Sequence, residues 1–210
     1  MKKKKIMTRR DFLVATGIGG GVGLGLTAGG FALAEKHLWP FASSKAGTRI
    51  SFPRAARTGR VKEYTFEAAL TTIMIGARQV TTWAYNGAIP GPELHIMEGD
   101  TLRVTVKNRL HNNEGTSTHW HGVPLVNSMD GVPGATQQAI ARGQDFVYEF
   151  VAPTAGTYFY HSHVGLQLDR GLYGALIIES SREQKNYDQD VALVLDDWLD
   201  GLPGTPDDAM

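Results

Sequence analysis

The most regular pattern in the chain is a short alternation of apolar and polar residues, interrupted repeatedly by glycine and proline. It is clearest in Thr101–Lys107, where Leu102, Val104 and Val106 alternate with polar residues. Successive side chains of a strand point to opposite faces, so this spacing predicts a strand with one buried face. Similar strand-like stretches are Val61–Ile75, Gln79–Tyr85, Glu93–Met97, Gln144–Val151, Thr157–Tyr160 and Leu172–Glu179.

Turn signals separate these stretches, and no long amphipathic helix lies between them. Asn86-Gly87 is a strong hairpin dipeptide, and Pro90-Gly91-Pro92 breaks the chain again before the next stretch. Many short strands with regular turns are typical of sandwiches and barrels. The pattern therefore predicts an all-β domain, a Greek-key β-sandwich or barrel, over residues 59–180.

The first residues resemble a twin-arginine export signal. A basic start is followed by Thr8-Arg9-Arg10-Asp11-Phe12-Leu13 and an uncharged, glycine-rich run to Ala34. Ala32-Leu33-Ala34 offers the small residues that a signal peptidase reads. We expect residues 1–34 to be a signal peptide that the twin-arginine translocase recognises, with the protein in the periplasm, outside the cell or at the cell envelope. The alternative is an uncleaved membrane helix, which the many glycines disfavour.

The rest of the chain divides by composition. Residues 35–58 mix Pro, Ser and Gly without a period and read as a linker. Residues 181–210 begin with a polar linker, after which Asp190–Trp198 predicts one more apolar strand. A single strand has little to pair with in the preceding domain, so we expect 181–210 to contain the first strand of a second, incomplete domain of the same kind.

Charge and cysteine content exclude several function classes. The formal net charge is zero, which gives no electrostatic basis for binding nucleic acid. The sequence has no cysteine, so it can form neither a disulfide nor a thiolate–metal bond. An electron-transfer cupredoxin, which needs a cysteine ligand, is thereby excluded.

Two histidine pairs are the candidate chemistry. Four of the seven histidines lie in His119-Trp120-His121 and His161-Ser162-His163. In a strand, positions i and i+2 share a face, so each pair can present both rings to one metal site. Imidazole suits copper and zinc alike, and the spacing leaves both open. The other three histidines, His37, His95 and His111, are isolated, and we interpret them as ordinary packed or solvated residues.

The flanking residues bring a family resemblance. His119-Trp120-His121-Gly122 and Tyr158-Phe159-Tyr160-His161-Ser162-His163 resemble the first two copper motifs of multicopper oxidases of the laccase type. Further matching stretches, in the family's order, are Thr82–Gly87, Pro90–Pro92, Glu98–Asp100, Met129–Pro133 and Gly171–Leu176. Asp190–Gly201 also resembles the family's entry into its second domain.

The resemblance implies a plastocyanin-like (cupredoxin) fold and a place at a trinuclear copper cluster that reduces O2 to water. It assigns His119 to the type 2 copper, His121 and His161 to one type 3 copper, and His163 to the other. Asp130 matches an acidic residue that helps to deliver protons to the cluster. A carboxylate near bound oxygen suits that role, although Asp130 before Gly131 also fits a simple turn residue. Trp120 and Ser162 should point away from the metal.

The same comparison shows what this sequence lacks. Type 1 copper requires a Cys ligand, and the remaining cluster histidines normally come from a later domain. We therefore expect a chain that ends before the type 1 copper domain and does not catalyse the reaction alone. Other cupredoxin domains or another subunit would complete the cluster, and a small phenol, amine or metal ion would be oxidised. The alternative is a stand-alone periplasmic copper-binding or copper-handling module; a zinc hydrolase would not explain the flanking motifs.

Overall fold

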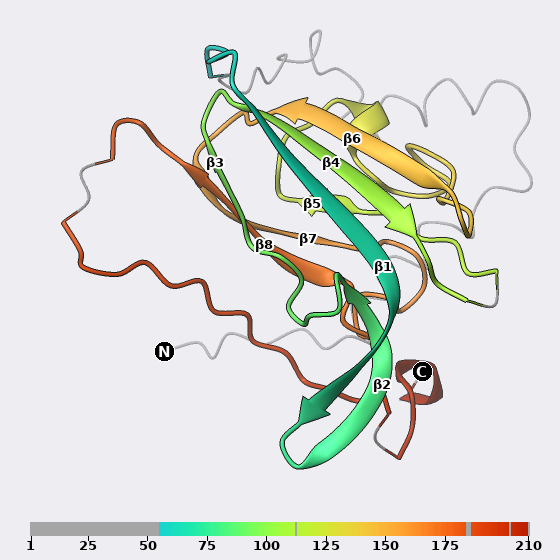
Figure 1. Ribbon diagram of the computed structural model, residues 1–210. Coiled ribbons are helices and arrows are strands. Elements are labelled where there is room, and N and C mark those ends of the chain that lie inside the picture. The colour runs from blue at the N-terminus through green and yellow to red at the C-terminus, as the bar shows by residue number, and fades with distance from the viewer. Residues whose placement is uncertain (1–54, 112, 184–185, 202, 210) are drawn as a thin grey trace, which may run out of the picture. The chain divides into compact units, whose positions relative to one another are not determined.

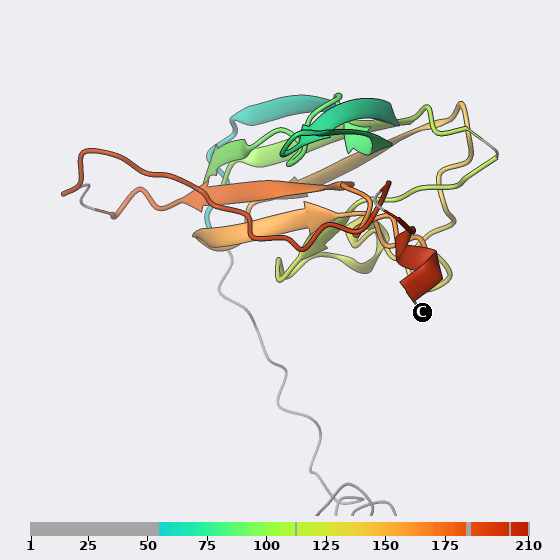
Figure 2. The same ribbon diagram turned by 90° about the horizontal axis from the view of Figure 1, so that it is seen from below.

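Two four-stranded sheets form the regular structure of the residues that the computed structural model describes, which are 55–111, 113–183, 186–201 and 203–209. The sheets pack face to face, as Figure 2 shows most clearly. Eight strands are present and the helices are two short 3₁₀ turns, η2 (Asn127–Met129) and η3 (Pro206–Ala209), within these residues. The expected all-β sandwich is confirmed.

The first sheet has the order β2-β1-β4-β6 (Figure 1). Its strands are β1 (Val61–Ile75), β2 (Arg78–Tyr85), β4 (Thr101–Asn108) and β6 (Asp145–Val151). β1 runs antiparallel to β2 and parallel to β4, and β4 runs antiparallel to β6. These strands agree with the stretches of alternating residues to within one residue at each end.

The second sheet has the order β3-β8-β7-β5, and the two strands at its β5 edge carry His119, His121 and His161. Its strands are β3 (Leu94–Met97), β8 (Tyr173–Glu179), β7 (Gly156–His161) and the short edge strand β5 (His119–His121). β3 pairs parallel with β8, while β8–β7 and β7–β5 are antiparallel.

The core lies between the sheets and is rich in aromatic residues. Leu102, Val104 and Val106 are all fully buried, as their alternation predicts. From the other sheet, Trp120 packs edge-on against Tyr148 and Phe150, with ring centroids 5.7 and 5.1 Å apart. Burying a side chain of this size contributes roughly 1.5–3 kcal/mol. Trp120 therefore anchors β5 to the core, while His119 and His121 lie on the opposite face of the strand.

Two motif glycines make room for Tyr160, the residue before His161. A Cβ added to Gly174 would lie 2.2 Å from the Tyr160 hydroxyl oxygen, and one added to Gly91 would lie 2.8 Å from it. The Tyr160 hydroxyl donates to the Pro92 carbonyl oxygen at 2.7 Å. The glycines in these motifs thus fix β7 against its neighbours.

A buried carboxylate fastens the residues that lead into the sandwich. Asp100 is fully buried and accepts hydrogen bonds from the Thr58 hydroxyl (2.6 Å), the Arg60 Nε (2.9 Å) and the Met97 amide (3.2 Å). Burial raises the pKa of Asp100, but these hydrogen bonds outweigh it and leave the pKa below its ordinary value. The predicted signal at 1–34 and the linker up to residue 54 lie outside the described residues.

The C-terminal segment differs from expectation. Residues Asp190–Trp198 form no strand in the described structure, and Leu193 and Leu195 are 82% and 93% exposed. A strand forms only when a neighbour satisfies its backbone groups, and no described strand pairs with this segment. The start of a second domain there stays a prediction. None of the described helices has the length and apolar character to cross a membrane.

Candidate metal centre

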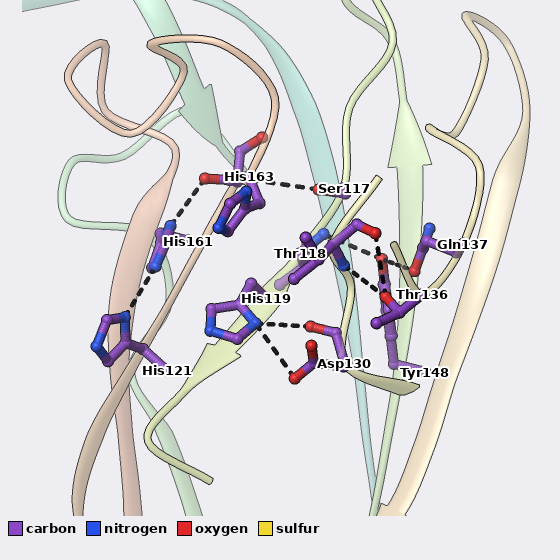
Figure 3. Close-up of polar contacts among 12 residues, drawn as sticks. Ser117, Thr118, His119, His121, Asp130, Thr136, Gln137, Tyr148, His161 and His163 are labelled. Carbon is purple, nitrogen blue, oxygen red and sulfur yellow. Dashed lines mark hydrogen bonds and ion pairs between the residues drawn. The ribbon is translucent and has the colours of Figure 1, made fainter. Parts of the chain in front are cut away.

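The β5–β7 ladder brings three imidazoles together. His119 lies directly opposite His161 in the register, Trp120 opposite Tyr160, and His121 opposite Phe159. Because side chains alternate, the two aromatic residues of the middle pair enter the core while the histidines face outward. One potential ligand atom each from His119, His121 and His161 lies within 4.8 Å of the others. The paired strands thus bring these three rings together (Figure 3), and their role as metal ligands stays a prediction.

Main-chain carbonyl oxygens orient two of these rings. The Nδ1 of His119 lies 2.7 Å from the Asp130 carbonyl oxygen, and the Nδ1 of His161 lies 2.8 Å from that of Ser162. A carbonyl oxygen only accepts, so each Nδ1 carries the proton and donates it. Each Nε2 is then left with a free lone pair, as a metal ligand requires.

The third ring faces His161 directly. His121 Nδ1 and His161 Nε2 are 3.2 Å apart. Metal–imidazole bonds are about 2.0–2.1 Å long for zinc, so nitrogens at this separation can reach a single ion. Phe159 stacks on both rings, with centroids 4.5 Å from His121 and 5.0 Å from His161. This stacking restricts the two ring planes.

His161 is held in the neutral form. Burial lowers its pKa, and the positive potential of His119, His121 and His163 lowers it further, against an opposing hydrogen bond to Ser162. The side chain is only 7% exposed. A metal ion binds neutral imidazole, so this environment favours the ligand form near neutral pH.

His163 departs from the strand-based prediction. β7 ends at His161, so the alternation of a strand does not orient His163. The backbone turns here because the Ser162 amide donates to the Leu172 carbonyl oxygen and the His163 amide donates to the Ser117 hydroxyl. The His163 ring is exposed and lies 5.5 Å from His119 and 6.0 Å from His161 between centroids. Its ring is thus as close to His119 as the His121 ring is, but its ring nitrogens lie outside the group of ligand atoms formed by the trio.

Asp130 lies against His119 through both its main chain and its side chain. Besides the carbonyl contact, a carboxylate oxygen is 3.5 Å from His119 Nδ1. Asp130 also caps the short η2 turn, and Gly131 follows with φ +78°. A Cβ on Gly131 would lie 1.9 Å from the Thr118 carbonyl oxygen. The turn therefore places Asp130 against the His119 ring, so its place in the turn is compatible with the predicted role at the site.

The remaining predictions can be placed as well. Trp120 and Ser162 are buried and point away from the trio, as expected. His95 lies at the far edge of the sheet, bonded to Glu93 and Glu179 through its two ring nitrogens. His111 is half-buried and outside the metal-ligand group, and His37 lies outside the described residues.

Several contributors carry no recognisable sequence signal. Every residue type has a main-chain carbonyl oxygen. Only the fold therefore shows that the carbonyl oxygens of Asp130 and Ser162 orient imidazole rings. Phe159 could have been found, because it lies two residues before His161 and so shares its face. Gln167 lies in the loop between β7 and β8, where no strand periodicity applies.

The donor set fits copper. Three imidazoles, two of them fixed as Nε2 donors, match a metal that prefers nitrogen ligands, and zinc would be served equally. The sequence has no cysteine to supply a type 1 site. The ligand chemistry alone therefore leaves the metal open.

Comparison with known proteins decides the family. The family model described as multicopper oxidase matches residues 67–183. The chain belongs to the multicopper oxidase family. The match contains both histidine pairs, Asp130 and the loop between β7 and β8.

Relatives and solved structures agree with this family. The chain is 41% identical over 207 residues to the multicopper oxidase MmcO of Mycobacterium tuberculosis, covering 97% of this chain and 38% of that protein. It is 42% identical over 181 residues to copper resistance protein A of Escherichia coli, covering 85% of this chain and 29% of the relative. The chain thus spans well under half the length of either relative.

The fold comparison points the same way. The crystal structure of a multicopper oxidase from Pseudomonas thermotolerans matches with a TM-score of 0.56 and 37% identity, covering 61% of this chain and 31% of that one. The expected cupredoxin-like fold is confirmed. Copper is the metal that the family name implies.

Proposed function

We propose that this chain supplies half of the trinuclear copper centre of an exported multicopper oxidase. The complete enzyme would reduce O2 to water while it oxidises a phenol, an amine or a metal ion. The observation that carries the proposal is the three-imidazole group, in which His121 Nδ1 and His161 Nε2 face each other at 3.2 Å. Further support comes from the family match over residues 67–183.

The four histidines would bind three different copper ions. His121 and His161 would share one type 3 copper, because their ring nitrogens already converge. His119, whose Nε2 is free, would hold the type 2 copper, and His163 would reach the second type 3 copper. Bound copper supplies the one-electron redox chemistry that side chains lack.

Asp130 would move protons to the oxygen that is reduced. Forming water consumes protons, and a carboxylate at the cluster can relay them from solvent. Its side chain is about one-third exposed, at 32%, and lies 3.5 Å from His119 Nδ1, so it touches both solvent and a ligand ring. The main-chain carbonyl orients His119 independently of the carboxylate.

The other half of the centre would come from further cupredoxin domains or another subunit. The segment 181–210 would contribute the first strand of the next domain. Val191, Leu193, Val194 and Leu195 are all exposed, so this apolar stretch is left uncovered by the described sheets. Residues 1–34 would direct export through the twin-arginine translocase.

Copper titration of the purified chain tests the half-site. Replacing His121 or His161 with Ala should lower the copper affinity at least about tenfold, since each removes a ligand. The matched control is His95→Ala, at the far edge of the same sheet, which should leave the affinity unchanged. Asp130→Asn should also keep the affinity, because the carbonyl contact remains. Equal loss in all three histidine variants, or no loss in any, contradicts the proposal.

A further inference from the structure

His163 is placed by a loop and not by a strand, so something else must hold it. β7 ends at His161 and β8 begins at Tyr173. Within the described residues, the His163 ring makes no hydrogen bond, and its backbone amide donates to the Ser117 hydroxyl at 3.2 Å. Its position relative to the strand-held trio therefore depends on how the loop of residues 162–172 is fixed.

Gln167 fixes that loop through three side-chain hydrogen bonds. Its Oε1 accepts from the Ser162 hydroxyl at 2.6 Å and from the Thr116 hydroxyl at 2.8 Å. Its Nε2 donates to the Gly115 carbonyl oxygen at 2.8 Å. The side chain is 2% exposed, so each of these bonds is shielded from water. The amide thus joins the residue between His161 and His163 to the segment that precedes His119.

The segment on the other side of this link is itself firmly anchored. Thr116, Ser117 and Thr118 are all fully buried. Thr116 exchanges two backbone hydrogen bonds with Ile140, and the Thr118 amide donates to the Tyr148 hydroxyl at 3.0 Å. The Tyr85 hydroxyl adds a contact of 3.1 Å to the Ser117 carbonyl oxygen. Gln167 therefore connects the loop to a segment that buried hydrogen bonds hold in place.

We propose that Gln167 is a positioning residue that sets His163 relative to His119, His121 and His161. Glutamine suits this position because one amide supplies both an acceptor for two hydroxyls and a donor for a carbonyl. Methionine, of similar length, has no donor and only a weakly accepting sulfur. The proposal depends on the proposed function only for what the four rings bind, since the positioning exists in the metal-free chain.

The test measures ring and amide signals in the metal-free protein. In Gln167→Met, NMR should show the His163 ring resonances shifted or broadened while those of His119 and His121 stay in place. Exchange of the His163 amide hydrogen should become about 3–10 times faster, as expected for loss of one hydrogen bond's worth of stability. Thr116→Val, which removes one donor with little change in shape, should give a smaller change in the same direction and covers the case in which Gln167→Met does not fold.

The matched control is Gln137→Met on the opposite flank. Gln137 accepts from the Tyr148 hydroxyl at 2.9 Å, so it contacts the same anchored region without touching the loop. This variant should leave the His163 signals unchanged. Equal shifts of all four rings in Gln167→Met, or an unchanged His163, would overturn the proposal. If the wild-type chain binds no copper in the titration, that result would instead contradict the proposed function.

Discussion

Three of the four paired histidines are positioned by strands and the fourth by a loop, although the two pairs have the same spacing. His119, His121 and His161 lie on paired strands, where the β5–β7 register sets their positions. His163 lies beyond the end of its strand and depends on buried polar contacts in a loop. A ladder places side chains through many repeated backbone bonds, whereas a loop needs particular side chains at particular points. The strand-held part should thus tolerate changes that displace the loop-held part.

The largest expected effect is on the turn that brings Asp130 to His119. Gly131→Ala places a methyl group 1.9 Å from the Thr118 carbonyl oxygen at φ +78°. The free energy of unfolding should fall by at least about 3 kcal/mol, through both steric clash and backbone strain. Urea denaturation measures the loss.

Gly134→Ala provides the control for that prediction. Gly134 has the same φ of +78° in the same loop, but nothing lies within 4 Å of an added Cβ. This change should cost only about 1 kcal/mol, the strain of the left-handed backbone. Equal losses in the two variants would mean that the close approach to Thr118 is unimportant.

A smaller loss of stability is expected when the hydrogen bond between Tyr148 and Thr118, the residue before β5, is removed. The Tyr148 hydroxyl accepts from the buried Thr118 amide, and burial raises the pKa of Tyr148 to about 12, so the phenol stays neutral. Tyr148→Phe leaves that amide unsatisfied and should lower the free energy of unfolding by about 1–3 kcal/mol.

Tyr64→Phe is the matched change at a half-buried tyrosine whose ring packs against the core but whose hydroxyl hydrogen bond is exposed. The Tyr64 hydroxyl donates to the His95 carbonyl oxygen at 3.1 Å where water can replace it. The loss should stay below about 1 kcal/mol. Thermal unfolding of the two variants side by side would show whether burial of the partner sets the cost, and a larger loss in Tyr64→Phe would contradict it.

The smallest expected effect is a pH dependence at the far edge of the second sheet. The hydrogen bond that His95 donates to Glu93 raises the pKa of His95 most, burial opposes it, and the hydrogen bond to Glu179 raises it further. Protonated His95 thus stabilises the fold below its unfolded pKa of about 6.5, and this contribution is lost as the pH rises through the raised pKa. Because His95 is 44% exposed, the contribution should stay below about 1 kcal/mol.

Denaturation of the wild type and of His95→Gln across this pH range checks the sign. The stability difference between them should be largest in mildly acidic solution and should vanish in alkaline solution. A difference that grows as the pH rises would show that the two carboxylates do not stabilise the imidazolium.

The sequence predicted most of the strands and the faces on which their side chains lie, because repeated backbone pairing determines both. The buried alternation of β4 and the shared face of His119 and His121 follow from strand geometry alone. The end of β7 at His161 could not be predicted, because it depends on contacts with Leu172 and Gln167 that are distant from any local pattern. For Asp190–Trp198 the local pattern favours a strand, but the described structure provides no partner for it. Pattern predicts which residues prefer a strand, and tertiary contacts decide whether one forms.

The most direct test of the copper half-site is a crystal structure of the copper-loaded chain, with anomalous diffraction recorded at the copper absorption edge. The account predicts an anomalous peak that contacts both His121 Nδ1 and His161 Nε2, the two nitrogens that lie 3.2 Å apart without metal. A peak at His95 and Glu93 alone, or well-ordered histidine rings with no anomalous peak between them, would contradict it.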